Sequence, residues 1–224
     1  MEQRHLRNIP ALTEAEQTLL AGKTVAVVGC GGLGGYLVEL LCRIGVGGIR
    51  AVDCDAFEMS NLNRQILATM DTLGCSKAAA AAQRVQQIDP GVRVQAFHVV
   101  LDDSNARELI RGCDAVLDAL DSIGARRILA AACEAEGIPY IHGAISGWVA
   151  QAAVSMPGDG LIDRLYPPET ILSDRSVLSF TPALCAAMQT SMCIKLLTGR
   201  PMETGQICYF DLLSQEYAQI PMIL

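Results

Sequence analysis

Short apolar runs alternate with longer mixed stretches along most of the chain. The runs are rich in Val, Ile, Leu and Ala, as buried strands are, and the stretches between them have the length and apolar spacing of helices. Pro90-Gly91 and Gly137 mark helix ends, because proline and glycine interrupt helices. The predicted helices cover residues 14–21, 33 onwards, 77–88, a short stretch ending near 111, and 124–136; the predicted strands cover 25–28, 49–52, 92–100, 115–117 and 139–144.

The last third of the chain has a different pattern. We predict a strand over 148–156, a loop-rich crossover over 157–181, an apolar helix over 183–197 and two closing strands over 206–211 and 216–220. Strands that alternate with helices predict a doubly wound, mostly parallel sheet. The whole pattern therefore indicates a Rossmann-like α/β fold with antiparallel strands added in the C-terminal third. Residues 1–23 read as an N-terminal arm with a short helix, and residues 24–224 as a single domain.

A glycine-rich turn follows the first predicted strand. Gly29, Gly31 and Gly34 satisfy the G-x-G-x-x-G spacing, and Gly32 lets the backbone approach a ligand more closely. Backbone N–H groups and a helix N-terminus can then face a phosphate. Asp53 ends the next strand, where a carboxylate meets a ribose hydroxyl. The turn predicts nucleotide binding; the alternative is a tight turn that only packs helix against sheet.

Polar side chains follow several of the predicted strands. Ligands of such sheets bind beyond the carboxyl ends of the strands, so we expect these residues to converge on one crevice. His142 and His98 are expected to be strand histidines with satisfied hydrogen bonds rather than catalytic groups. The groups that we expect at the crevice are the glycine turn, Asp53, Asp55, Asp118, Asp121 and His142.

Several residues could bind a triphosphate in this crevice. Arg64 lies one short loop beyond Asp53, and its guanidinium can neutralise phosphates bidentately. Lys77 begins a helix, where the macrodipole disfavours a cation, so its position calls for an anionic partner. Asp121 has the hard carboxylate that suits Mg²⁺ held together with phosphate oxygens. The alternatives are an ordinary solvated loop for Asn61 and Arg64, and an N-cap of the helix near Gly124 for Asp121.

Composition limits the function classes. The 224 residues are 51% hydrophobic and 18% charged, which favours a folded protein with surface to cover, plausibly by a second subunit. A net charge of -7 without clustered Lys or Arg argues against a general nucleic-acid binder. Nine cysteines without a C-x-x-C pair indicate reduced, buried thiols. No signal peptide and no uninterrupted membrane-length run are visible, so we expect a cytoplasmic protein.

Six motifs in order resemble the ThiF/MoeB/HesA family of the ubiquitin-activating-enzyme superfamily. They are R-H-L-R-N-I, G-C-G-G-L-G-G, D-C-D, S-N-L-N-R-Q, L-G-C-S-K and D-A-L-D-S. The resemblance covers nearly the whole chain. It implies that residues 24–224 form an adenylation domain which uses Mg-ATP to adenylate the C-terminal Gly-Gly carboxylate of a small ubiquitin-like sulfur carrier and releases pyrophosphate. It also implies a homodimer in which an N-terminal arginine reaches the neighbouring subunit's site.

The resemblance assigns a role to each matching residue. The glycine turn would hold the adenylate, Asp53 the ribose, and Asn61 and Arg64 the phosphates. Lys77 would contact the phosphates and the transition state. Asp121 would bind the magnesium ion. Arg7 would reach from the N-terminal arm of one subunit into the active site of the other.

The chain departs from the family pattern in three places. The C-x-x-C pairs of zinc-bearing relatives are missing, so we predict no structural zinc. The crossover reads Ser173-Asp174-Arg175-Ser176 where some relatives carry a cysteine, which makes a covalent enzyme thioester doubtful and leaves Cys185 as a weak candidate. Asp121-Ser122 replaces the Asp-Asn of many carrier-activating members. The same Asp-Ser pair occurs in the branch that dehydrates a tRNA threonylcarbamoyl-adenosine.

Three alternatives to carrier adenylation therefore stay open. The first keeps the fold and the adenylation but acts on a tRNA-borne threonylcarbamoyl carboxylate. The second is an NAD-binding oxidoreductase, which has no need of Arg64 and Lys77. The third is a non-catalytic module that binds a ubiquitin-like partner, against which the presence of Asp53, Arg64, Lys77 and Asp121 argues.

Overall fold

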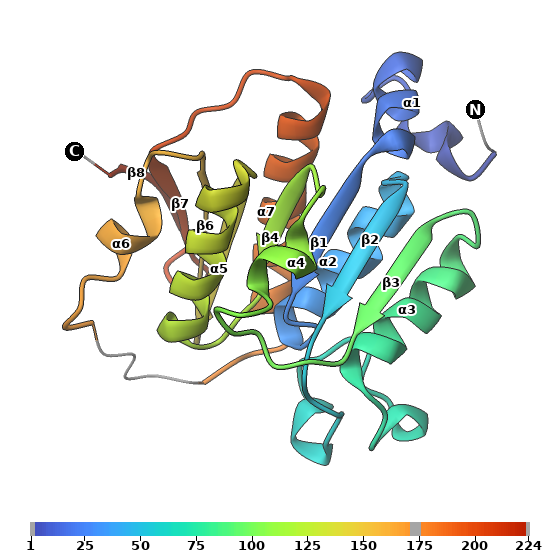
Figure 1. Ribbon diagram of the computed structural model, residues 1–224, viewed down its shortest axis with the longest axis horizontal. Helices are drawn as coiled ribbons and strands as arrows, with labels where there is room; N and C mark the ends of the chain where they lie inside the picture. The colour runs from blue at the N-terminus through green and yellow to red at the C-terminus, as the bar shows by residue number, and fades with distance from the viewer. Residues whose placement is uncertain (1–2, 171–175, 223–224) are drawn as a thin grey trace.

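One eight-stranded sheet runs through the part of the chain that the computed structural model describes, residues 3–170 and 176–222 (Figure 1). The order is β3-β2-β1-β4-β5-β6-β7-β8. The first five strands in this order are parallel, and β6, β7 and β8 are added antiparallel. This confirms the predicted fold class. The strands are β1 Thr24–Val28, β2 Gly48–Val52, β3 Arg93–Phe97, β4 Ala115–Asp118, β5 Tyr140–Ser146, β6 Val149–Ser155, β7 Gln206–Asp211 and β8 Glu216–Pro221.

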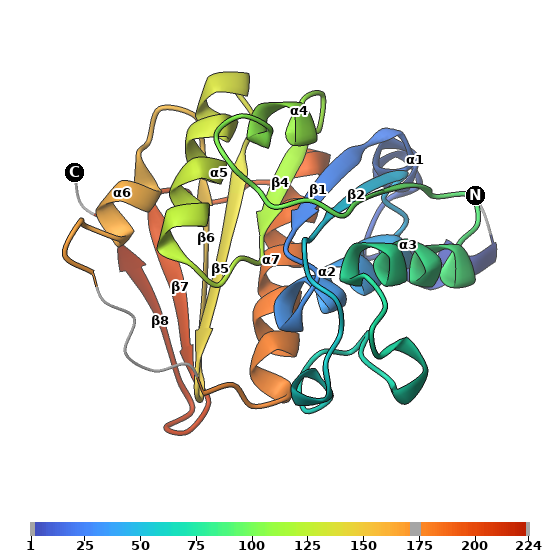
Figure 2. The ribbon, with the colours of Figure 1, turned by 60° about the horizontal axis from the view of Figure 1, so that its bottom comes forward.

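Helices cover both faces of the sheet, which Figure 2 shows from below. Alternate residues of the central strands face opposite cores: Val25 and Val27 pack with α2, α3 and α7, whereas Ala26 and Val28 pack with α4 and α5. This is the period-two pattern of a doubly covered strand. The helices are η1 Gln3–Asn8, α1 Glu14–Gly22, α2 Gly32–Ile44, η2 Met59–Asn61, η3 Met70–Thr72, α3 Lys77–Ile88, α4 Ala106–Ile110, α5 Ile123–Glu136, α6 Leu161–Leu165 and α7 Phe180–Thr198.

The last helix, α7, has the length and mean hydropathy of a membrane span, although Gln189 and Lys195 interrupt its apolar sequence. In this fold it packs against β5, β6 and α2, and half of its most apolar window is buried. Cys193 and Ile194 belong to the core on this face of the sheet. Its apolar composition is therefore explained by its place as a core helix.

Two predicted boundaries differ from the structure by three residues, and the predicted crossover loop contains a helix. The third strand ends at Phe97 because its neighbour β2 ends at Val52, so His98 lies beyond the strand and is exposed rather than within it. Helix α7 begins before Pro182, which is tolerated in a first turn because no helical hydrogen bond to its nitrogen is needed there. The predicted crossover loop contains the short helix α6, and its residues 171–175 lie outside the described residues.

The glycine turn brings α2 very close to the end of β1. Gly29 has φ of +91°, which favours glycine, and a Cβ added to Gly34 would lie 1.7 Å from the Gly29 carbonyl oxygen. Any side chain at position 34 would push the first turn of α2 away from the sheet. The third glycine of the motif is therefore required by the packing of helix on strand.

We predict that Gly34→Ala lowers the free energy of unfolding by about 1–3 kcal/mol, because the added methyl group overlaps the backbone of residue 29. Chemical denaturation monitored by circular dichroism measures this change. Gly124→Ala is the matched control: Gly124 is also in the first turn of a helix, and no atom lies within 4 Å of its added Cβ. We expect the control to leave stability unchanged or to raise it by up to about 1 kcal/mol. Equal effects of the two substitutions would contradict the close approach.

Candidate active site

A cavity of about 800 Å³ opens beyond the carboxyl ends of β1, β2, β4 and β5. The glycine turn and the N-terminus of α2 form one wall, and the loop between β2 and α3 forms another. Residues 143–146 of β5 and Val177 of the crossover close the far side. The structure brings eight of the predicted site residues to this cavity: Gly29, Gly31, Gly32, Asp53, Asn61, Arg64, Lys77 and Asp121.

Asp53 connects the glycine turn to the end of β2. Its carboxylate accepts hydrogen bonds from the backbone N–H of Cys30 at 2.6 Å and of Asp55 at 2.8 Å. The side chain is half-buried and lines the cavity. Because each carboxylate oxygen can accept more than one hydrogen bond, Asp53 keeps acceptor capacity for a ligand hydroxyl while its position is fixed.

Lys77 has the anionic partner that its place at a helix N-terminus calls for. Its Nζ lies 2.9 Å from Oδ2 of Asp55, and the backbone N–H of Lys77 donates to the Asp55 carbonyl at 2.9 Å. The lysine side chain is 9% exposed and the aspartate side chain 61% exposed. The hydrogen bond from Lys77 lowers the pKa of Asp55 below its usual value. The ammonium group is thus held at the cavity wall by a partner that solvent reaches freely.

Asn61 and Arg64 belong to a short loop that folds on itself. The Asn61 side-chain oxygen accepts from the backbone N–H of Glu58 at 3.0 Å. Arg64 Nη1 donates to the Ser60 carbonyl at 2.9 Å and to the side chain of Asn63 at 2.8 Å. These local hydrogen bonds fix a guanidinium group at the cavity. They show that the loop is ordered around its polar side chains.

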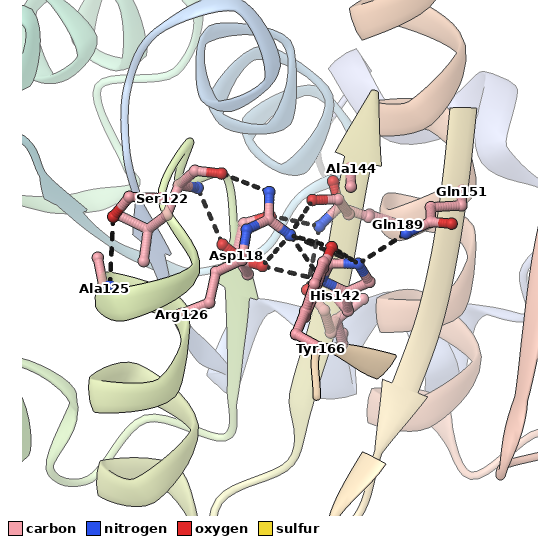
Figure 3. A network of polar contacts seen from close by, with 12 residues as sticks. Asp118, Ser122, Ala125, Arg126, His142, Ala144, Gln151, Tyr166 and Gln189 are labelled. Carbon is pink, nitrogen blue, oxygen red and sulfur yellow. Dashed lines mark hydrogen bonds and ion pairs between the residues drawn. The ribbon is translucent and has the colours of Figure 1, made fainter. Parts of the chain in front are cut away.

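Asp121 is exposed and lines the cavity beyond the end of β4. The N-cap of α5 is Ser122, whose hydroxyl oxygen accepts from the backbone N–H of Ala125 at 3.3 Å (Figure 3). The alternative that Asp121 caps this helix is therefore wrong. Asp121 lines the cavity together with Arg64 and Lys77, and its carboxylate is of the type that binds a divalent cation.

Asp118 and His142 do not reach the crevice, contrary to prediction. Both side chains are completely buried. His142 is in the middle of β5, which continues to Ser146, and both side chains contact Arg126 of α5. His142 Nδ1 lies 3.0 Å from Asp118 Oδ2, and Arg126 Nη1 lies 3.0 Å from the same oxygen (Figure 3). Burial lowers the pKa of His142, so the imidazole is neutral at pH 7. His142 is thus a satisfied structural histidine, as expected, and no catalytic group.

Arg126 was missed by the sequence interpretation. It lines the cavity although only 6% of the residue is exposed, and with Asp118, His142 and Tyr166 it forms what we call the buried network. Burial opposes the ionisation of Asp118, but the charge of Arg126 and the hydrogen bond from His142 hold the pKa of Asp118 below its usual value. An aspartate inside a buried strand needs a counter-charge, and that requirement was the available signal for Arg126.

Two residues with predicted roles lie away from the cavity. Arg7 is exposed in η1, and Figure 1 shows the N-terminal arm at the end of the sheet opposite to the strand ends that form the cavity. Gly34 packs on Gly29 behind the turn and contributes no surface to the cavity.

Cys185 is a poor candidate for covalent chemistry. It is completely buried in α7, its thiol contacts the carbonyl oxygens of Ala144 and Gln151, and burial raises its pKa to about 12. A thiol is nucleophilic only as the thiolate, so Cys185 is unreactive near neutral pH. Residues 173–175 of the crossover, where some relatives carry a cysteine, lie outside the described residues.

One group of potential metal ligands occurs among the described residues. Side-chain ligand atoms of Asp53, Cys54 and Asp55 lie within 4.8 Å of one another. Asp53 already accepts two backbone hydrogen bonds and Asp55 pairs with Lys77, so both carboxylates have other partners. Asp121, the predicted magnesium ligand, is separate from this group.

Comparison with known proteins gives a consistent result. The sequence profile of the ThiF family matches residues 2–223. The SAMP-activating enzyme E1 of Haloferax volcanii is 34% identical over 216 residues, which cover 93% of this chain and 79% of that protein. The sulfur carrier protein adenylyltransferase of Thermus thermophilus is 32% identical, with coverage of 95% and 83%. The adenylyltransferase and sulfurtransferase MOCS3 of Xenopus laevis is 29% identical, and the chain spans about half of its length.

Solved structures agree on the fold. The crystal structure of E. coli MccB with ATP superimposes with a TM-score of 0.82 at 20% identity, over 99% of this chain and 72% of that chain. PaaA gives a TM-score of 0.80 at 21% identity, over 93% and 76%. At these identities the likeness concerns the fold alone.

The burial of the thiols generates a labelling prediction. Brief treatment of the native protein with iodoacetamide at pH 8 should modify the exposed Cys54 and Cys75 and leave Cys185 unmodified, as measured by peptide mass spectrometry. Partial burial and the nearby Asp55 raise the pKa of Cys54, so its labelling should increase as the pH rises. Protein unfolded in guanidinium is the control, in which all nine cysteines should react. Labelling of native Cys185 at the rate of Cys75 would restore it as a candidate nucleophile.

Proposed function

The chain belongs to the ThiF family and is an adenylyltransferase, and we propose that it transfers AMP from ATP to the C-terminal Gly-Gly carboxylate of a small ubiquitin-like sulfur-carrier protein. One observation carries this proposal: a glycine turn, the carboxylate of Asp53 at the end of β2, and the cations Arg64 and Lys77 all line one cavity. Relatives named as sulfur-carrier and SAMP-activating enzymes support the substrate class.

We assign the nucleotide to the cavity as follows. The glycine turn and the N-terminus of α2 face the phosphates with backbone N–H groups. Asp53 accepts hydrogen bonds from the ribose hydroxyls, and Asn61, Arg64 and Lys77 contact the phosphates. The exposed carboxylate of Asp121 offers the hard oxygen that suits Mg²⁺, which would neutralise phosphate charge when bound.

The reaction needs positioning and charge neutralisation more than proton transfer. A carrier carboxylate oxygen attacks the α-phosphorus, a new oxygen–phosphorus bond forms, and the bond to the leaving pyrophosphate breaks. The nucleophile is already ionised at pH 7, so no general base is required. Arg64 and Lys77 stabilise the negative charge that accumulates on the pyrophosphate. Lys77 can exchange Asp55 for the phosphate, because the Asp55 carboxylate is 61% exposed and water can solvate it after the lysine has moved.

Position 122 does not favour the tRNA alternative. Ser122 caps α5, and asparagine is an equally good N-cap. Serine at this position, where many carrier-activating members have asparagine, is therefore explained by helix capping alone. The net charge of -7 also disfavours a large polyanion as substrate. An oxidoreductase would leave the two cations at the cavity without a role.

The arm is proposed to act in another subunit. Arg7 lies at the end of the sheet opposite to the cavity of its own chain, so a contribution to catalysis requires the cavity of a second copy. We propose a homodimer in which residues 1–23 of one chain complete the adenylation domain, residues 24–224, of the other.

The first functional prediction concerns the cavity. Asp121→Ala and Arg64→Ala should each lower the exchange of labelled pyrophosphate into ATP by at least about 100-fold in the presence of a Gly-Gly-ending carrier, because each removes charge stabilisation at the phosphates. Asp163→Ala and Arg93→Ala, which are exposed and outside the cavity, are the matched controls and should keep full exchange. Full exchange in both cavity variants would refute the assignment.

The second functional prediction concerns the arm. Arg7→Ala and Asp121→Ala should each be inactive alone, whereas a mixture that exchanges subunits should recover up to about half of the activity of one site, because both defects can fall in the same cavity of a heterodimer. The other cavity of that heterodimer then contains neither defect and is active. Pyrophosphate exchange measures the recovery, and native mass spectrometry shows whether heterodimers have formed. Heterodimers without recovered exchange would exclude an arm that acts between subunits.

A further inference from the structure

The buried network holds an arginine that touches the cavity and whose two terminal nitrogens both bind the protein. Figure 3 shows the Arg126 guanidinium between the ends of β4 and β5, with Tyr166 from the crossover beside it. We propose that Arg126 is a positioning residue of the proposed site, which fixes the backbone that carries Asp121 and the edge of β5 that closes the cavity. This inference rests on the proposed function, because it concerns the magnesium role of Asp121.

The first contact fixes the residue before Asp121. Arg126 Nη2 donates to the carbonyl oxygen of Leu120, and the backbone N–H of Leu120 donates to Asp118 Oδ1 at 2.9 Å. Both backbone polar groups of Leu120 are therefore bound by one buried ion pair. The loop turns immediately afterwards, so the direction in which Asp121 leaves the sheet is set by this pair.

The second contact fixes the opposite wall. In the described residues, β4 pairs with β5 only through Val116 with Tyr140 and Leu117 with Ile141. Beyond these pairs Arg126 Nη1 donates to the Gly143 carbonyl at 3.0 Å. From the other face of the sheet, Gln189 Nε2 donates to the carbonyls of Asp118 and Ile141 at 2.8 and 3.0 Å. The two side chains replace strand pairing and hold the strand ends apart.

The geometry requires arginine rather than any cation. One guanidinium group reaches the carboxylate of Asp118 and the carbonyls of Leu120 and Gly143, which lie in different directions. The planar fork of arginine has five N–H donors for such a set, whereas the ammonium group of lysine is a single point with three. Arg126→Lys therefore keeps the charge that neutralises Asp118 and loses the simultaneous contacts with the two carbonyls.

The test is a double-mutant cycle that measures ATP binding by calorimetry with and without Mg²⁺. In the wild type, Mg²⁺ should strengthen ATP binding, and Asp121→Ala should remove this gain. Arg126→Lys should reduce the gain by about tenfold, as expected for a residue that orients a metal ligand. The double variant should bind Mg-ATP no more weakly than Asp121→Ala alone, because Arg126 acts through Asp121. A weakening by the same factor in both backgrounds would overturn the proposal.

Controls separate positioning from general loss of structure. Arg84→Lys is the matched substitution. Arg84 of α3 forms a bidentate ion pair with Glu39 of α2, and neither residue lines the cavity. Arg84→Lys should leave the Mg²⁺ gain unchanged, and a loss equal to that of Arg126→Lys would overturn the proposal. If Arg126→Lys does not fold, the neutral pair Asp118→Asn with Arg126→Gln takes its place in the cycle.

The outcomes also separate this inference from the proposed function. A Mg²⁺ gain that depends on Asp121 and not on Arg126 refutes the positioning role alone. A wild-type protein without any Mg²⁺ gain refutes both. Pyrophosphate exchange supplies a second measure: Arg126→Lys should raise KM for Mg-ATP, in line with the weaker binding, whereas a purely structural defect would lower the amount of active protein and leave KM unchanged.

Discussion

The contact between Gly34 and the Gly29 carbonyl sets the distance between α2 and the central strand, and the site depends on that distance. With α2 seated against β1, its N-terminus and the turn before it lie at the strand ends. Asp53 then binds the turn from β2 through the backbone of Cys30. A larger residue at position 34 would displace the helix end, the turn and the partner of Asp53 together.

The site holds its cations in two different ways. Lys77 is paired with a carboxylate that solvent reaches, so water can solvate Asp55 when the ammonium group binds another partner. Arg126 is paired with a carboxylate that solvent does not reach, and removal of one member of such a buried pair costs about 3–5 kcal/mol. The pair with a solvent-exposed carboxylate suits a group that must move towards a ligand, and the buried pair suits a group that must stay in place.

Much of the fold was predictable because period-two burial, glycine stops and proline breaks act locally. Ser76 and Ser122 cap their helices, and Gly137 ends α5 in the left-handed conformation. The convergence of Asp53, Arg64, Lys77 and Asp121 followed from the rule that parallel strands open at one edge. The depth of Asp118 and His142 could not be predicted, because it depends on how far β5 extends and on the packing of Arg126 and Tyr166 against the two side chains. Asp118 called for a counter-charge, but the sequence does not show which cation supplies it, because Arg126 reaches Asp118, Leu120 and Gly143 only through the packing of α5 on the sheet.

The position of β1 at the centre of the sheet has a kinetic consequence. One edge of β1 pairs with β2, which follows closely in the chain, but the other pairs with β4, and Thr24 bonds to Asp114 across 90 positions. Contacts between distant residues form slowly, because a long loop must close first. During synthesis the edge of β1 that faces β4 therefore waits for its partner, as an unpaired apolar strand able to associate with other chains. The walls of the cavity beyond β4 and β5 are therefore assembled after the glycine turn and Asp53, and aggregation competes with folding until β4 arrives.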